Sequence, residues 1–244
     1  IELPLDDAPV SYNEKQKEIE LLFYQLDSND INYRILGFEA WMDDYIADIY
    51  QLKDIKSHEF IYKVMAFKAE TAAVYDKDTN SFLREYIKYS VGQTIDNFSV
   101  IGGPSKEDKY NFYLQTDSID FRQPKLIEYA TAFYENYDGQ LEQLQRLALE
   151  KALASASIEQ VVSTLAKDPF IYNQQWAEFV ALQLIIEYEQ SQRLEKTLAL
   201  ALIQQLAKKA LQAELRAAAK YFFLEKSKLS EGQVWDKSYL QQNF

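Results

Sequence analysis

Apolar residues recur at three- and four-residue steps through most of this 244-residue chain, a spacing that predicts amphipathic α-helices. The pattern is longest over residues 31–52, and it returns over 58–75 and from Arg193 onward. No convincing strand alternation occurs, apart from a short stretch at 98–101, and no fixed solenoid spacing recurs. We therefore predict an all-α fold, an irregular array of about ten helices without a regular repeat.

Capping residues and prolines mark where the predicted helices begin. Ser11 and Ser157 each start a capping-box pattern, in which the serine is followed three residues later by Glu or Gln. Pro124 suits the first position of a further helix. From Arg193 onward the periodicity hardly stops, so one long helix and two helices joined near 208–209 both fit the pattern.

The same signals predict the domain organisation. We expect an extended segment over residues 1–10, a helical domain over 11–227 and an irregular tail over 228–244. The clearest internal break is Gly102-Gly103 with the proline that follows. A single domain and two subdomains that meet near 96–104 are both compatible with it.

The chain has no cysteine and one histidine, His58, and this scarcity restricts its chemistry. Without cysteine there is no disulfide, thiolate metal site or thiol chemistry in this sequence. A di-iron bundle needs paired Glu-x-x-His motifs, and Ile55 stands three residues before His58. A Ser-His-Asp triad would have to use His58, and no Gly-x-Ser-x-Gly elbow occurs. We predict no catalytic residues, no metal ligands and no cofactor.

The formal net charge is −12, and it is concentrated in the N-terminal half. Residues 1–122 hold 23 acidic and 13 basic side chains, a net of −10, whereas residues 123–244 hold 15 and 13. This balance argues against a nucleic-acid partner, and it favours a basic protein partner or a solvated acidic surface. No run approaches the roughly 18–20 apolar residues of a membrane-spanning helix. The start at Ile1 rather than methionine predicts a processed or trimmed N-terminus.

Two local patterns suit catalysis or anion binding less well than a structural role. Asp43-Asp44 and Glu187 with Glu189 are carboxylate pairs, but adjacent acids on a helix point about 100° apart. They are therefore not placed like a glycosidase pair, although carboxylates from separate helices can still meet in a cleft. Gly102 to Lys106 offers free N–H groups, a helix start and a cation. A loop followed by a helix cap explains the same residues.

Aromatic residues are abundant, with 18 tyrosines and 14 phenylalanines, and most lie at helical core spacing. Tyr110, Phe112 and Tyr113 crowd one segment. They form the one candidate partner or ligand surface that we identify from the sequence, as rings that line a groove for a sugar or a peptide.

One stretch around the start of the helix at Pro124 is distinctive, and it reads Ile119-Asp120-Phe121-Arg122-Gln123-Pro124-Lys125-Leu126. It resembles the helical N-terminal region of TlpA-type thioredoxin-like lipoproteins of Bacteroidetes. The downstream order is similar, with Asp168-Pro169-Phe170 and then an aromatic helix through Tyr188. The likeness covers residues 60–235, and the catalytic Cys-x-x-Cys of that family has no counterpart here. The resemblance implies a lipid anchor upstream as one expectation.

The resemblance implies a non-catalytic helical accessory domain of the cell envelope, in the periplasm or at the surface, beside a thioredoxin-like redox domain. It would position that domain or recognise a protein partner for it. The acidic charge supports an alternative, an immunity-type protein that neutralises a basic protein. A second alternative is a carbohydrate- or peptide-binding module that uses exposed tyrosines. A cytoplasmic location remains compatible with the composition.

Overall fold

A computed structural model describes residues 27–52, 58–98, 104–116 and 119–227. Several predictions from the sequence lie outside these residues. They are the extended segment over 1–10, the capping box and helix after Ser11, the glycines at 102 and 103, and the tail over 228–244.

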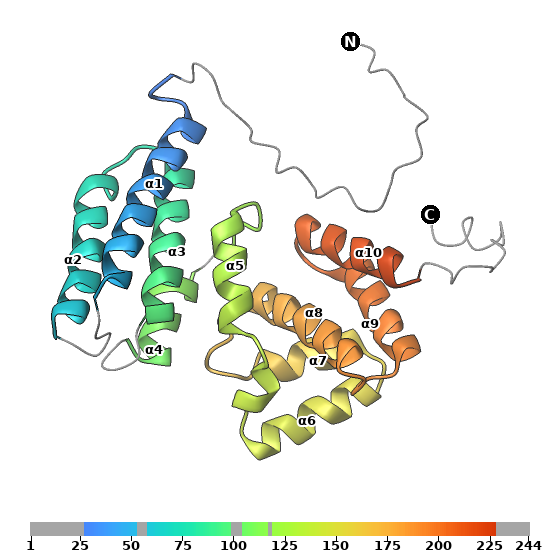
Figure 1. Ribbon diagram of the computed structural model, residues 1–244. Helices are drawn as coiled ribbons and strands as arrows, with labels where there is room; N and C mark the ends of the chain where they lie inside the picture. The colour runs from blue at the N-terminus through green and yellow to red at the C-terminus, as the bar shows by residue number, and fades with distance from the viewer. Residues whose placement is uncertain (1–26, 53–57, 99–103, 117–118, 228–244) are drawn as a thin grey trace, which may run out of the picture. The chain divides into compact units, whose positions relative to one another are not determined.

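The described residues form ten α-helices and contain no β-strand, which confirms the predicted all-α fold (Figure 1). A π-helical turn (η1, Tyr110–Leu114) follows α4 directly, and a 3-10 turn (η2, Tyr137–Gln140) lies between α5 and α6. The α-helices are α1 (Ile31–Tyr50), α2 (His58–Tyr75), α3 (Ser81–Phe98), α4 (Lys106–Lys109), α5 (Pro124–Phe133), α6 (Gln143–Ala154), α7 (Ile158–Leu165), α8 (Gln174–Gln190), α9 (Lys196–Lys209) and α10 (Ala213–Ser227).

The chain divides into two compact units, and the division falls inside α1, between Asp44 and Tyr45. Of the first unit, the structure describes residues 27–44, which contain the first part of α1. All other helices belong to the second unit, where α2 packs against α3 and α3 against α5. A subdomain boundary near 96–104 stays a prediction.

Helix α8 lies in the main core of the second unit because its sequence is apolar around most of its circumference. It packs between α7 and α9, and α9 packs in turn against α10 (Figure 1). Trp176 is fully buried, and its indole N–H donates to the carbonyl oxygen of Leu114 at 2.9 Å. Burial of a ring of this size with its polar atom satisfied stabilises the fold by several kcal/mol, about 3–5 by comparison with truncations elsewhere.

The periodic segment from Arg193 onward forms two helices, α9 and α10. Of the two alternatives, one long helix or two, the second is therefore correct. The chain leaves the helical conformation at Ala210, where ψ is 145°. Glu178 of α8 is buried, and one of its carboxylate oxygens accepts the Leu211 N–H at 2.8 Å. Arg216 also donates to the Ala210 carbonyl. Backbone groups released by the break are therefore bonded to side chains.

Helix α6 exposes two leucines whose three-residue spacing would place them on one apolar face of the helix. Leu144 is 79% exposed and Leu147 is 46% exposed. The buried face consists of Leu149, Ala152 and Leu153, near the end of the helix, where α6 packs against α7. The buried stripe of α6 is therefore narrower than the apolar stripe that its sequence offers.

Candidate functional site

The three rings identified from the sequence do not share one environment. Tyr110 and Tyr113 are each only 4% exposed, and both belong to the main core. The Tyr113 ring lies against Gly92 of α3, where an added Cβ would come within 2.5 Å of it. Phe112 is 53% exposed, with the ammonium groups of Lys68 and Lys88 at 4.7 and 4.8 Å from its ring centre. The π-helical turn points two rings inward, which leaves Phe112 as the surface member.

The described part of the proposed anion loop forms a helix cap. The Ser105 hydroxyl accepts the Asp108 N–H at 3.1 Å, and the Asp108 carboxylate accepts the Ser105 N–H at 3.0 Å. The hydrogen bonds from Ser105 hold the pKa of Asp108 below its usual value. This reciprocal pair satisfies the donors that an anion would have used.

Chemistry that depends on histidine or on a metal finds no support among residues 27–227 that are described. His58 is the exposed first residue of α2. In the described ranges no group of three or more His, Cys, Asp or Glu side chains is arranged to hold a metal ion. None of the described helices is long and apolar enough to cross a membrane.

A hollow with a volume of about 790 Å³ lies along α5, α8 and α10 in the second unit. We call it the α5–α8–α10 groove. Its size falls within the range of small-molecule and peptide sites. It is lined by Gln93, Phe121, Ile127, Glu128, Thr131, Ala132, Glu135, Phe179, Leu182, Gln183, Ile186, Glu187, Glu214, Leu215 and Ala218.

Local sequence signals place the three helices that build the groove. Helix α5 begins at Pro124, and the buried Gln123 side chain accepts the Lys125 N–H while it donates to the Phe82 carbonyl of α3 at 3.0 Å. The Asn173 side chain caps α8 by accepting the Trp176 N–H at 3.0 Å. An ion pair of 2.8 Å between Lys226 and Glu189 links α10 to α8.

Most of the residues that line the groove are apolar, and we call these the floor of the groove. Its α8 side uses positions 179, 182, 183, 186 and 187, which share one face because they are spaced by three and four residues. The rings of Phe121 and Phe179 lie 6.1 Å apart. Gln183 joins α8 to α5, since its amide donates to the Thr131 carbonyl and to the Glu187 carboxylate, both at 2.9 Å.

The rim of the groove is acidic. Four glutamates line it, and no lysine or arginine does. Glu128 pairs with Lys125 at 2.9 Å. Within the part of the chain that is described, Glu135, Glu187 and Glu214 form no ion pair. Burial raises the pKa of Glu187, and the nearby charges of Asp138 and Glu135 act in the same direction against its hydrogen bonds. Among the described residues, Glu135 and Glu187 therefore carry negative charge without an ion pair, while Glu214 lies within electrostatic range of Arg122.

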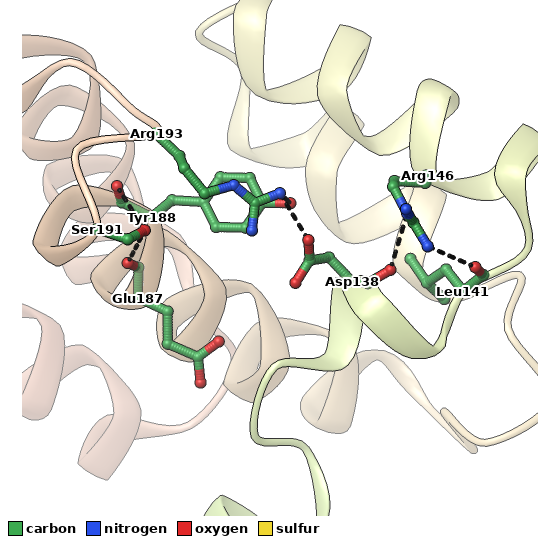
Figure 2. A network of polar contacts seen from close by, with 7 residues as sticks. All are labelled: Asp138, Leu141, Arg146, Glu187, Tyr188, Ser191 and Arg193. Atoms are coloured by element: carbon green, nitrogen blue, oxygen red, sulfur yellow. Dashed lines mark hydrogen bonds and ion pairs between the residues drawn. The ribbon is translucent and has the colours of Figure 1, made fainter.

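A network of hydrogen bonds around Asp138 lies at the C-terminal end of α8 (Figure 2). Arg193 donates to the carboxylate of Asp138 at 2.7 Å and to the hydroxyl of Tyr188 at 3.0 Å, and its guanidinium stacks over the Tyr188 ring at 3.9 Å. Arg146 donates to the Asp138 carbonyl at 3.1 Å. Burial alone would raise the pKa of Asp138, but the hydrogen bonds from Arg193 and Tyr188 hold it below its usual value. This network joins η2, α6 and α8, and it is structural.

Comparisons of this protein with family models, with curated proteins and with solved structures each found no match. The function is therefore argued from the geometry of the groove and its charges.

Sequence reasoning singled out one rim residue, Glu187, but only as part of a pair with Glu189. The structure separates the two side chains, because Glu189 pairs with Lys226 while Glu187 faces the groove. The remaining lining residues come from α5, α8 and α10, together with Gln93 of α3 and Phe121 before α5. One signal in the sequence could have indicated the groove. Phe179, Ile186 and Glu187 share one face of α8, so an acidic residue stands beside apolar ones on a helix that is otherwise largely buried.

Proposed function

We propose that this chain is a non-catalytic helical binding domain that takes a basic amphipathic helix of a protein partner in the α5–α8–α10 groove. The observation that carries the proposal is the combination of an apolar floor with a rim of unpaired carboxylates. Such a groove suits a helix that presents an apolar stripe flanked by lysine or arginine. The occupant's cations would neutralise Glu135, Glu187 and Glu214.

Charge complementarity decides between occupants. An acidic or uncharged helix would bury the same apolar surface, but it would leave the rim carboxylates unpaired, which costs free energy on binding. A basic helix gains charge-assisted contacts at the rim and is attracted from a distance, so its association is faster.

The resemblance to thioredoxin-like lipoproteins supplies one candidate partner, a redox domain of the cell envelope. The acidic rim equally favours a basic protein that the chain would neutralise, as an immunity protein does. No observation favours a sugar or peptide platform at Tyr110 and Tyr113, whose rings are buried.

The proposal is tested by calorimetric titration with a synthetic peptide of leucine and lysine, about 15 residues long so that it can form a helix. A peptide with glutamate in place of lysine is the matched control. We expect saturable binding of the basic peptide alone. Equal binding of both peptides, or of neither, would contradict the proposal.

The position of the site is tested by a matched pair of variants on α10. Ala218 lines the groove and is exposed, while its neighbour Ala217 is exposed outside the groove. We expect Ala218→Trp to fill the groove and weaken binding about tenfold or more, which corresponds to about 1.4 kcal/mol. Ala217→Trp should bind as the wild type does. A similar loss in both variants would place binding elsewhere.

A further inference from the structure

A second cavity lies on the other side of α5 and has the opposite charge. Its volume is about 290 Å³, and the described residues that line it include two lysines and no carboxylate. Gln93 and Ala132 line both this cavity and the α5–α8–α10 groove, so the two hollows adjoin. The other lining residues are Lys106, Lys109, Tyr129, Phe133 and Gln140.

The helix cap described above sets the direction of both lysines. The reciprocal bonds between Ser105 and Asp108 fix the first turn of α4. Lys106 and Lys109 are three residues apart, so they lie on one face of that turn, and both line the cavity. Tyr129 and Phe133, four residues apart on α5, supply aromatic walls opposite a polar lining of lysine and glutamine.

Lys106 is held by aromatic rings rather than by a counter-ion. Its ammonium lies 4.4 Å from the ring centre of Phe170, 4.8 Å from that of Tyr137 and 5.6 Å from that of Phe133. The charge of Asp168 acts on the Lys106 ammonium. The Asp168 carboxylate already accepts hydrogen bonds from the Tyr137 hydroxyl at 2.6 Å and the Phe170 N–H at 2.8 Å. No carboxylate in the described ranges forms an ion pair with Lys106.

A half-buried ammonium in this setting is suited to an anionic ligand. Ring contacts order the Lys106 side chain in advance, so little further conformational freedom is lost when an anion binds. Burial lowers the pKa of Lys106, with Asp168 opposing the shift, and an anion in the cavity would stabilise its charged form.

We infer that this cavity binds a small organic anion, a carboxylate or phosphate carried on a flat ring. Lys106 and Lys109 bind the charged group, and the ring lies against Tyr129 and Phe133. Gln93 and Gln140 supply amide groups for polar substituents. This site is independent of the binding function proposed for the groove, because its lysines and rings belong to a different hollow.

Benzoate and phenyl phosphate are the probes, with acetate as the anion without a ring and benzyl alcohol as the ring without a charge. Calorimetry or the shifts of backbone amide resonances measure the dissociation constants. We expect benzoate and phenyl phosphate to bind about tenfold or more tightly than either control. The resonances that move should lie on α3, α4 and α5 around the cavity. Equal affinity for acetate and benzoate, or no binding of either probe, would overturn the inference.

Variants assign the charge to Lys106. Lys106→Met keeps the apolar stem against the rings and removes the ammonium, so we expect about tenfold weaker binding of benzoate. Lys106→Arg should retain binding, and Lys167→Met, at an exposed lysine outside the cavity, is the matched control. Ala218→Trp should leave benzoate binding intact, which separates this site from the groove. Unchanged binding in Lys106→Met, with its fold verified by circular dichroism, would contradict the assignment.

Discussion

Asp138 lies at the end of helix α8 and Glu187 belongs to that helix, yet their surroundings shift the pKa values of the two carboxyl groups in opposite directions. Asp138 is 6% exposed and is bonded to Arg193 and Tyr188, and its pKa is lowered. Glu187 lies at the groove, where burial raises its pKa and no cation of the described residues faces it. A charge matched within the chain stabilises the fold, whereas an unmatched charge beside an apolar floor is available to a partner. Under the proposed function, this contrast separates acids that stabilise the fold from acids that would contact a partner.

The largest expected effect is on the structural side. Asp138→Ala removes the carboxylate to which both Arg193 and Tyr188 are hydrogen-bonded, so we expect a loss of about 2–3 kcal/mol in the free energy of unfolding. Urea denaturation measures it. Glu214→Ala, on the rim, should change the same quantity by less than about 0.5 kcal/mol. Similar losses in the two variants would remove the distinction between network and rim.

The next effect is on binding. Replacing Glu135, Glu187 and Glu214 together by glutamine removes the unpaired charge and keeps the shape of the groove. We expect the basic peptide to bind to this variant about tenfold more weakly. The free energy of unfolding of the variant should hardly change. The salt dependence of the remaining binding should also become shallower. A triple variant that binds as tightly as the wild type would show that the rim plays no part.

The pH dependence of stability should show the structural role of Asp138. Its pKa is lower in the folded state, so its stabilisation is complete above the unfolded-state pKa of about 3.9 and is lost as the pH falls through the folded-state value. We therefore expect the difference in unfolding free energy between wild type and Asp138→Asn to shrink below about pH 4. Urea titrations at several pH values measure it. A difference that persists unchanged into acid would contradict the assignment.

Glu187 should give the smallest effect and the opposite sign. Its pKa is higher in the folded state, so its charged form destabilises the fold above that pKa, and the penalty disappears as the pH falls below the unfolded-state value. Glu187→Gln should therefore stabilise the protein at neutral pH by a few tenths of a kcal/mol, since solvent screens a half-exposed group. Thermal unfolding of the wild type and of Glu187→Gln, each at pH 7 and in acid, measures this difference. Destabilisation at pH 7 would indicate that the Gln183 hydrogen bond dominates.

Much of the fold was predictable because helix periodicity and caps are local signals. The start of α5 at Pro124 and the cap at Ser157 follow directly from the sequence, although the Gln160 side chain does not return the bond that a full capping box requires. The buried face of α6 was not predictable. Which of its leucines is covered depends on its packing against α7, and Leu144 lies on the exposed side of the helix.

The candidate sites depend on contacts that no local pattern encodes. Asp138 and Arg193 are 55 residues apart in the sequence, and the groove combines α5, α8 and α10, which other elements separate along the chain. The aromatic spacing over 110–113 indicated a surface of rings, but a π-helical turn directs Tyr110 and Tyr113 into the core. A basic partner, which the net charge favours, stays a prediction. Only the tertiary structure shows which of the described acids form no ion pair.

The most direct test of the central claim is a map of backbone amide shifts during titration with the basic leucine–lysine peptide. We predict that the resonances that move belong to α5, α8 and α10, that they saturate together, and that they stop moving in Ala218→Trp. Shifts concentrated around the acidic residues of α1, or spread evenly over the surface, would contradict the claim that the α5–α8–α10 groove is the binding site.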